Sequence, residues 1–234
     1  MSTIGAAFVE AGQMIWALDR DLVEVTALSL RVTVGAVIIA SAIGMPLGAW
    51  LAVSRFPRRR LVIGALNGLM GLPPVVVGLL VYMLLSRAGP LGGMGLLFSP
   101  TAMVIAQVVI VTPIIASIAH QTIRELWAEY RDLLISLHAS KVQRIQALLW
   151  DGRRSLLTAA LAGFGRAIGE VGAIIIVGGN IDGATRVLTT SIALETARGD
   201  FSRALALGFI LIALAIAVNL MLHALSRTER EGRW

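Results

Sequence analysis

The sequence predicts an all-α integral membrane protein with five transmembrane helices. Of its 234 residues, 57% are hydrophobic and only 6% are aromatic, and the mean hydropathy is +0.83, so aliphatic side chains fill long runs. Five runs are long enough to cross about 30 Å of hydrocarbon at roughly 1.5 Å per residue. We place the spans at residues 32–53, 61–85, 101–119, 155–177 and 204–225.

Basic residues are concentrated on one side of these spans, which predicts the orientation of the chain. Most of the twenty Lys and Arg residues follow the first span, lie between the third and fourth spans, or follow the fifth. They are Arg55, Arg58, Arg59, Arg60, Arg124, Arg131, Lys141, Arg144, Arg153, Arg154, Arg227, Arg230 and Arg233. Because Lys and Arg are enriched in cytoplasmic loops, we expect the N-terminus outside, the C-terminus inside, and residues 227–234 as a cytoplasmic tail.

Residues 1–30 precede the membrane domain, which we place at residues 31–226. Apolar side chains recur in the first segment at helical spacing, with polar side chains on the other face. The apolar set is Ile4, Ala7, Phe8, Ala11, Ile15 and Leu18. This pattern predicts an amphipathic helix on the extracytoplasmic membrane surface. Since the first basic residue is Arg20, the segment lacks the charged region of a cleavable signal peptide, and we expect the first span to direct insertion.

Prolines fall inside two of the spans. Pro73 and Pro74 lie in the second span, and Thr112 precedes Pro113 in the third. Proline frees backbone carbonyls in a membrane helix, and these must be satisfied by neighbouring groups or by a water-lined cavity. A tolerated kink and a kink that lines a pathway are both consistent with these residues.

The longest segment between spans is residues 120–154, on the side assigned to the cytoplasm. It is polar, and its pattern predicts an amphipathic helix, a short break near "SLHAS", and a second helix that leads into the fourth span. Two antiparallel spans need only a few residues to connect them. We therefore expect a protruding helical elbow that docks a soluble partner, with a passive connector as the alternative.

The fourth span carries two charges within the sequence "GFGRAIGEVGA". Arg166 and Glu170 would each cost roughly 2.5 to 3.5 kcal/mol alone at the bilayer centre. A spacing of four residues places them on one helix face, where each can neutralise the other. A functional pair and a structural pair that fastens this helix to its neighbours both remain open. Gly165, Gly169 and Gly172 form a small-residue stripe that permits close helix packing.

The segment between the fourth and fifth spans lies on the outer side. Turn residues open it, and a short helix from Val187 to Ala197 with many hydroxyl side chains follows. The candidates to face the mouth of a pathway or a docked partner are Asn180, Thr185, Arg186, Thr189 and Thr190. A solvated loop is an equally simple interpretation.

Several function classes lack their motifs in this sequence. It has no GxxxxGK[ST] phosphate loop, so we do not expect this chain to hydrolyse ATP. It has no HExxH motif and no Ser, His and Asp placed where spans could form a catalytic pocket, so we do not expect an enzyme. With no Cys and three scattered His residues, neither a disulfide framework nor a metal centre is predicted.

The sequence resembles the membrane-spanning permease subunits of binding-protein-dependent ATP-binding-cassette importers. Their cytoplasmic loop carries an E-A-A motif, three residues and then Gly. Here Asp132, Leu133 and Leu134 take the E-A-A positions, His138 takes the Gly position, and "ASKVQRIQALLWD" continues in register. The likeness is strongest to the oxyanion branch, first to tungstate permeases and then to molybdate and sulfate permeases. The segments that carry it are "LSLRVT", "GLPPVVVGLL", "GFGRAIGEVGAIIIVGGNI" and "TRVLTTSIALET".

The resemblance implies a type I importer permease fold with a cytoplasmic coupling helix, in a bacterial or archaeal inner membrane. It implies a homodimer of this chain, a cytoplasmic ATPase dimer that binds ATP and Mg, and an extracytoplasmic oxyanion-binding protein. No nucleic acid and no cofactor of this chain's own are implied. The implied ATPase-coupling residues are Asp132, Leu133, Ser136, Leu137, His138, Ala139, Ser140 and Lys141. The implied pathway or gate residues are Pro73, Pro74, Val75, Thr112, Asn180, Thr189 and Thr190.

The expected substrate is tungstate, with a molybdate or sulfate permease as the alternative. A tight mid-membrane site for a dianion would need several donors or helix N-termini, but Arg166 is the only Arg deep in any predicted span. We therefore expect a low-affinity passage, with selectivity left to the binding protein. The alternative of another class is a non-transporting membrane scaffold that docks a soluble protein through its elbow.

Overall fold

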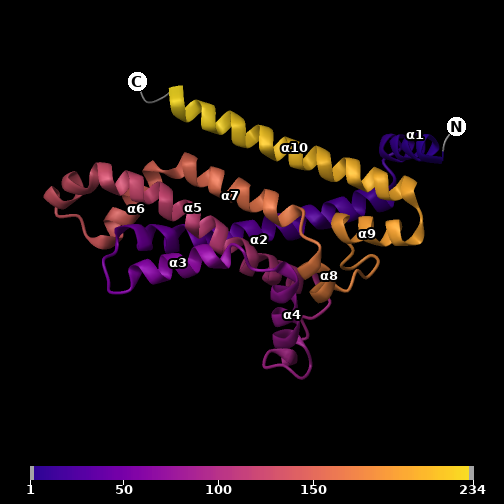
Figure 1. Ribbon diagram of the computed structural model, residues 1–234, viewed down its shortest axis with the longest axis horizontal. Helices are drawn as coiled ribbons and strands as arrows, with labels where there is room; N and C mark the ends of the chain where they lie inside the picture. The colour runs from indigo at the N-terminus through magenta and orange to yellow at the C-terminus, as the bar shows by residue number, and fades with distance from the viewer. Residues whose placement is uncertain (1–2, 232–234) are drawn as a thin grey trace. The chain divides into compact units, whose positions relative to one another are not determined.

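The computed structural model describes the backbone of residues 3–231 and the side chains of residues 5–221. Over these residues the fold is helical, without a strand, which confirms the predicted class (Figure 1). The elements are α1 (Thr3–Trp16), α2 (Arg20–Val53), α3 (Arg59–Leu69), α4 (Pro74–Leu85), the 3₁₀ helix η1 (Gly92–Met94), α5 (Pro100–Ser136), α6 (Lys141–Asp151), α7 (Arg153–Ile168), α8 (Gly172–Gly178), α9 (Leu188–Arg198) and α10 (Phe201–Glu231).

Three of these helices are long and apolar enough to cross a membrane, namely α2, α5 and α10. Two further spans result if α3 with α4, and α7 with α8, are each counted as one interrupted span. The described residues therefore hold three to five candidate spans. The spans placed at residues 61–85 and 155–177 are each bent at a break, by 98° between α3 and α4 and by 66° between α7 and α8.

Proline chemistry explains the break in the second span. α3 ends at Leu69, and α4 begins at Pro74 after Pro73, whose φ is −62° and ψ is 120°. The residue before a proline is pushed out of the α region. Proline itself suits the first position of a helix, where its missing N–H is not needed. The two adjacent prolines therefore prevent one continuous helix and start the next.

Two helices extend well beyond the apolar runs that predicted them. α2 begins at Arg20 instead of residue 32, and α5 continues to Ser136 instead of ending at residue 119. The early start of α2 is capped by Asp19, whose Oδ1 accepts hydrogen bonds from the N–H groups of Asp21 at 3.1 Å and Leu22 at 3.3 Å. Hydropathy marks only the part of a helix that suits hydrocarbon, so it misses such polar extensions.

The chain divides into two units, each assembled from three separate segments. The first unit comprises Met1–Gly35, Pro73–Gln107 and Ala167–Val218. The second unit comprises Ala36–Leu72, Val108–Arg166 and Asn219–Trp234. Helices α1, α4, α8 and α9 thus belong wholly to the first unit, whereas α3 and α6 belong wholly to the second.

In the first unit, α1 packs on protein through part of its apolar face. Ala11 is fully buried in a cluster with Leu22 and Leu207, and Ile15 packs against that cluster. Glu10 Oε2 accepts a hydrogen bond from Ser202 Oγ at 2.7 Å. The predicted helix is present, but its apolar face does not lie wholly on a membrane surface, because these residues form part of a protein core.

Also in the first unit, α4 and α8 lie side by side with very little space between them (Figure 1). A Cβ added at Gly78 would lie 2.7 Å from the Cα of Ala173. A Cβ added at Gly172 would lie 2.7 Å from Cγ2 of Val75. Glycine at Gly78 therefore permits a backbone approach that a larger side chain would obstruct, and Gly172 allows close contact with a side chain, as small residues do at membrane helix interfaces.

In the second unit, α6 packs against α5 and the end of α2. Leu148 of α6 is 1% exposed and clusters with Ile123 of α5 and Ala52 of α2. Gly48 brings α2 close to α5, because a Cβ there would lie 2.4 Å from the carbonyl oxygen of Ala116. The second half of α6 is thereby held against α5 and α2.

Candidate functional site

The predicted elbow is present in the second unit as two helices joined by a short link. α5 ends at Ser136 and α6 begins at Lys141, so the break falls at "LHAS" as the sequence predicts. All of the predicted coupling residues except the half-buried Ala139 are exposed. The elbow is therefore available to a partner over most of its predicted contact residues.

The link begins with a Schellman motif that has histidine where glycine is usual. The N–H of Ala139 donates to the carbonyl of Leu134 at 3.1 Å, and the N–H of His138 donates to the carbonyl of Ile135 at 2.9 Å. His138 has φ +50°, in the left-handed region. Glycine adopts this region without the steric penalty that other residues meet. The geometry thus gives a physical reason for Gly at this position in the family motif.

A capping box then starts α6. The N–H of Gln143 donates to Ser140 Oγ at 3.3 Å, and the N–H of Ser140 donates to Gln143 Oε1 at 2.8 Å. The two reciprocal bonds satisfy donors that a helix start would otherwise leave free. Ser140 is therefore a structural residue of the elbow, whatever else it contacts.

The outer surface of the elbow carries apolar side chains in water-accessible positions. Leu137 is 67% exposed, Val142 is 62% exposed and Leu133 is 56% exposed. On the other side of α6, Lys141 Nζ lies 5.4 Å from the ring centroid of Trp50, a cation–π contact. An apolar surface on a rigidly held helix is suited to docking another protein.

Sequence reasoning missed one residue at the base of the elbow. Arg59 Nε donates to the carbonyl of Leu51 at 2.7 Å, and its Nη2 donates to the carbonyl of Ala52 at 3.3 Å. The same Nη2 lies 3.4 Å from Nε2 of His120. Arg59 thus satisfies carbonyls at the C-terminus of α2. In the sequence it was only one member of a basic cluster, and no local spacing indicates its partners.

In the fourth span, the helix ends before Glu170. α7 ends at Ile168 and α8 starts at Gly172, so Arg166 and Glu170 do not lie one turn apart on a single helix. The prediction that their spacing puts them on one helix face is therefore wrong. Apart from neighbouring backbone, no atom of this chain lies within 4 Å of a Cβ built at Gly165 or Gly169, whereas a Cβ at Gly172 would lie 2.7 Å from Cγ2 of Val75.

Side chains of the first unit satisfy the backbone groups that this break exposes. Gln107 Nε2 donates to the carbonyl of Ala167 at 3.0 Å. Thr189 Oγ1 donates to the carbonyl of Glu170 at 2.8 Å. The Glu170 carboxylate accepts from the N–H of Ala173 at 3.4 Å, and the residue is only 5% exposed. A broken helix at membrane depth requires such replacement partners, and these three residues supply them.

A small polar cavity lies beside this break. It has a volume of about 10 Å³ and is lined in part by Ser29, Thr33, Gln107, Glu170 and Thr189. Gln107 Oε1 is buried there without a hydrogen-bond partner. A cavity of about this size holds at most one water molecule.

The other predicted pathway residues are divided between the two units. Thr190 is 1% exposed, and its hydroxyl bonds the backbone of Val187 at the start of α9, which is the short helix that the sequence predicts. Asn180 is left-handed at φ +51° with a buried Oδ1 that has no partner. These residues and the segment from Pro73 to Val75 belong to the first unit, whereas Thr112 belongs to the second.

Comparison with known proteins identifies the family. Residues 44–231 match the family model described as binding-protein-dependent transport system inner membrane component. The chain is 39% identical to a tungstate uptake system permease protein of Peptoclostridium acidaminophilum, with 96% of this chain and 99% of that protein covered. It is 37% identical to a probable anion ABC transporter permease protein of Haloferax volcanii, with 91% and 93% covered.

A solved structure has the same fold. A chain of the MetNI methionine ABC transporter, solved in inward-facing conformations, aligns with a TM-score of 0.67 at 21% sequence identity, with 94% of this chain and 97% of that chain covered. The matched family covers most of the sequence. This chain therefore belongs to the binding-protein-dependent transport system inner membrane components, the non-catalytic permease subunits of ABC importers in which a partner ATPase hydrolyses ATP.

Proposed function

We propose that this chain is the permease of an ATP-driven importer that moves tungstate inward across the cell membrane. The observation that carries the proposal is the similarity to a tungstate permease along 96% of the chain at 39% identity. A second tungstate permease, from Campylobacter jejuni, is 36% identical over 68% of this chain. A molybdenum permease of Azotobacter vinelandii is 27% identical over 74%, so molybdate is the weaker candidate and sulfate is comparable to it.

The working unit would contain two copies of this chain, two ATPase subunits and an extracytoplasmic binding protein. The elbow supports the ATPase contact, because α6 is fixed by its buried Leu148 while Leu137 and Val142 stay exposed on the outside. Closure of the ATPase dimer would then pull on a helix that cannot move independently of α5. This mechanism transmits force through packing and needs no chemistry on the permease itself.

The passage through the permease would be of low affinity. Two buried hydroxyl groups near the broken fourth span are already used by backbone carbonyls, because Thr189 donates to Glu170 at 2.8 Å and Ser29 donates to Val25 at 2.8 Å. Tight binding of a dehydrated dianion needs several free donors. We therefore assign selection among oxyanions to the binding protein. Tight, stoichiometric binding of tungstate in mid-membrane by the permease complex alone would contradict this assignment.

Calorimetry on the cognate binding protein tests the substrate directly. We expect tungstate to bind more tightly than molybdate, and sulfate to compete weakly. Preference for molybdate or sulfate would replace tungstate as the substrate while leaving the importer assignment intact. A complex that shows no flux of any oxyanion with its ATPase and binding protein would instead favour the scaffold.

Site-specific labelling tests the proposed orientation, with the N-terminus outside and the C-terminus inside. The chain has no cysteine, so single cysteines introduced at Asp182 and at Ser136 report on one position each. Both sites are exposed. A membrane-impermeant maleimide added to intact cells should label Asp182→Cys and leave Ser136→Cys unlabelled until the membrane is opened. The reverse pattern would invert the assigned orientation.

A further inference from the structure

A cluster of arginines occupies the loop between α2 and α3, on the side that the arginine distribution assigns to the cytoplasm. Arg55 and Arg58 lie in the loop, and Arg59 and Arg60 begin α3. Arg59 is half-buried and bonds carbonyls at the end of α2. Arg55, Arg58 and Arg60 are exposed, and we call these three the loop arginines. They are free to contact a partner outside the chain.

No carboxylate of the described residues neutralises the loop arginines. Residues 25–124 contain no Asp and no Glu, so none is available nearby along the chain. The described side chains of the second unit include four carboxylates, Glu125, Glu129, Asp132 and Asp151. None of the four forms an ion pair with a loop arginine. The loop therefore carries three positive charges that this part of the chain leaves uncompensated.

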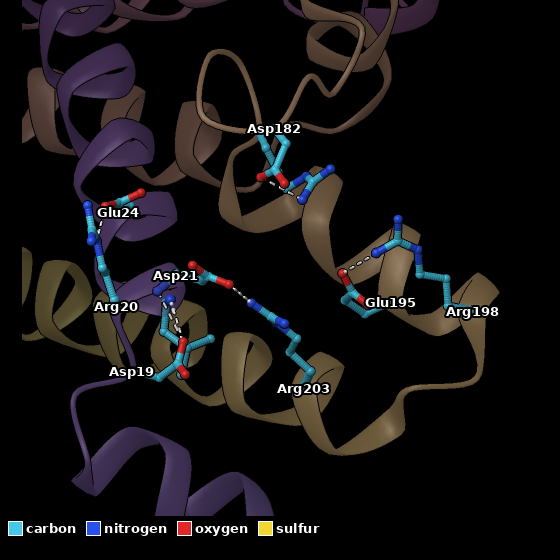
Figure 2. Close-up of polar contacts among 10 residues, drawn as sticks. Asp19, Arg20, Asp21, Glu24, Asp182, Glu195, Arg198 and Arg203 are labelled. Carbon is cyan, nitrogen blue, oxygen red and sulfur yellow. Dashed lines mark hydrogen bonds and ion pairs between the residues drawn. The ribbon is translucent and has the colours of Figure 1, made fainter.

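Arginines of the first unit differ, because four of them are paired with carboxylates of the same unit. The pairs are Arg20 with Glu24 at 2.8 Å, Arg186 with Asp182 at 2.8 Å, Arg198 with Glu195 at 3.2 Å, and Arg203 with Asp21 (Figure 2). The chain itself supplies the counter-charge there. For the loop arginines, a counter-charge must come from another molecule.

The surroundings of the loop indicate where that molecule lies. Leu61 is 68% exposed and Val62 is 41% exposed, and their N–H groups donate to the carbonyl of Arg58 at 2.9 and 3.2 Å. These two residues begin the apolar run of the second span. Trp50 is 40% exposed and stacks on Phe56, with ring centroids 5.2 Å apart. Because Trp is enriched at membrane–water interfaces, the loop arginines lie at the boundary between hydrocarbon and water.

We propose that the loop arginines bind the headgroup phosphate of an anionic phospholipid in the cytoplasmic leaflet. A guanidinium can donate two parallel N–H groups to phosphate oxygens, and the acyl chains would lie along Leu61 and Val62. A soluble phosphate has no chains to make the second contact. A zwitterionic lipid such as phosphatidylcholine carries its own cation, which the arginines repel. The proposal goes beyond the proposed transport function and takes from it only the side of the membrane.

Such a lipid would lie beside the base of the elbow. Lys141, the first residue of α6, has its Nζ 5.4 Å from the ring centroid of Trp50. Arg59, within the same cluster, has its Nη2 3.4 Å from Nε2 of His120 in α5. A lipid bound by the loop arginines would restrain the loop that joins these contacts. Anionic lipid would therefore steady the end of α2 on which the elbow rests.

Native mass spectrometry of the delipidated permease with its ATPase in detergent tests the site. The probe is dioleoylphosphatidylglycerol, and dioleoylphosphatidylcholine is the reference lipid with the same chains. A basic residue near an anionic lipid surface strengthens association by about fivefold. Arg58→Gln/Arg60→Gln should therefore weaken phosphatidylglycerol binding by about twentyfold and leave phosphatidylcholine binding unchanged. Arg58→Lys/Arg60→Lys should lose much less, because both charges remain.

Arg124→Gln/Arg131→Gln is the matched control. It removes two charges from exposed residues of α5 in the same unit, within the polar segment that follows the third predicted span. We expect this variant to bind phosphatidylglycerol as the unaltered chain does. Equal losses in the control and in Arg58→Gln/Arg60→Gln would overturn the site in favour of general charge attraction.

Three other outcomes would also overturn the proposal. Equal affinity of the unaltered complex for the two lipids would remove the selection for an anionic headgroup. Displacement of phosphatidylglycerol by an equal concentration of glycerol phosphate would assign the loop to a soluble phosphate. Unchanged lipid binding in Arg58→Gln/Arg60→Gln, with loss of the ATPase from the complex, would assign the loop to an acidic surface of the ATPase. The assay contains no tungstate and no binding protein, so the site and the transport function can each fail while the other stands.

Discussion

Substitution of Gly78 by alanine tests the closest contact between α4 and α8. The added Cβ would lie 2.7 Å from Ala173 Cα, whereas carbon atoms rest at about 3.5 to 4.0 Å. The obstacle is backbone, so it cannot rotate away, and one helix must shift by about 1 Å. Overpacking of this kind costs about 1 to 3 kcal/mol. Alanine is also the better helix former by about 1 kcal/mol, so the net loss should be about 0 to 2 kcal/mol.

A matched control separates the two effects. Gly208 of α10 has no atom within 4 Å of a built Cβ, so Gly208→Ala should gain about 1 kcal/mol from helix propensity alone. The difference between the two variants then measures the contact, at about 1 to 3 kcal/mol. Gly172→Ala should fall between them, because its obstacle is the methyl group of Val75, a side chain that is 55% exposed and can move.

The assay is thermal unfolding of the purified chain in nanodiscs, with all three variants at the same protein and lipid concentrations. We expect the transition temperatures to rank Gly208→Ala highest, Gly172→Ala next and Gly78→Ala lowest. If Gly78→Ala unfolds at the same temperature as Gly208→Ala, α4 and α8 do not approach as closely as described, and the packing of the broken spans must be revised.

Three further predictions concern the break and the elbow. Thr189→Val leaves the carbonyl of Glu170 without its donor and should lower stability by about 1 to 3 kcal/mol, whereas the exposed Thr196→Val should have little effect in the same thermal assay. His138→Gly removes the steric penalty of a left-handed residue, which is about 1 to 2 kcal/mol, but it adds about 0.5 to 1 kcal/mol of conformational entropy cost on folding. The transition temperature of this variant should therefore stay equal or rise. A lower transition temperature would contradict the left-handed backbone at His138. Leu137→Asp should abolish the stimulation of ATP hydrolysis by loaded binding protein without changing the transition temperature, and unchanged stimulation would remove Leu137 from the coupling surface.

Much of the helical architecture can be predicted from the distribution of apolar and polar residues along the sequence. Apolar runs predicted the helices of the membrane domain, and the elbow followed from the polar segment with a break before Ser140. A short helix was also expected from Val187 to Ala197, and α9 covers Leu188–Arg198. The spans followed from the length of apolar runs, and the helices of the elbow followed from the spacing of their apolar side chains.

The break in the fourth span could not be read from hydropathy. Residues 163–173 are apolar enough for a continuous span, and glycine is common in unbroken membrane helices. The break exists because Gln107 and Thr189, remote in sequence, replace the lost backbone bonds. No local spacing encodes such partners, and the same is true of Arg59, whose acceptors lie at the end of the preceding helix.

Transport by purified components tests the central claim most directly. The permease, its ATPase and its loaded binding protein are combined in proteoliposomes, with the binding protein on the side assigned to the outside, and movement of tungstate to the opposite side is measured with ATP and with a non-hydrolysable analogue. The account predicts ATP-dependent movement of tungstate that Leu137→Asp abolishes. Movement that continues without ATP hydrolysis, or no movement of any oxyanion in an assembled complex, would contradict it.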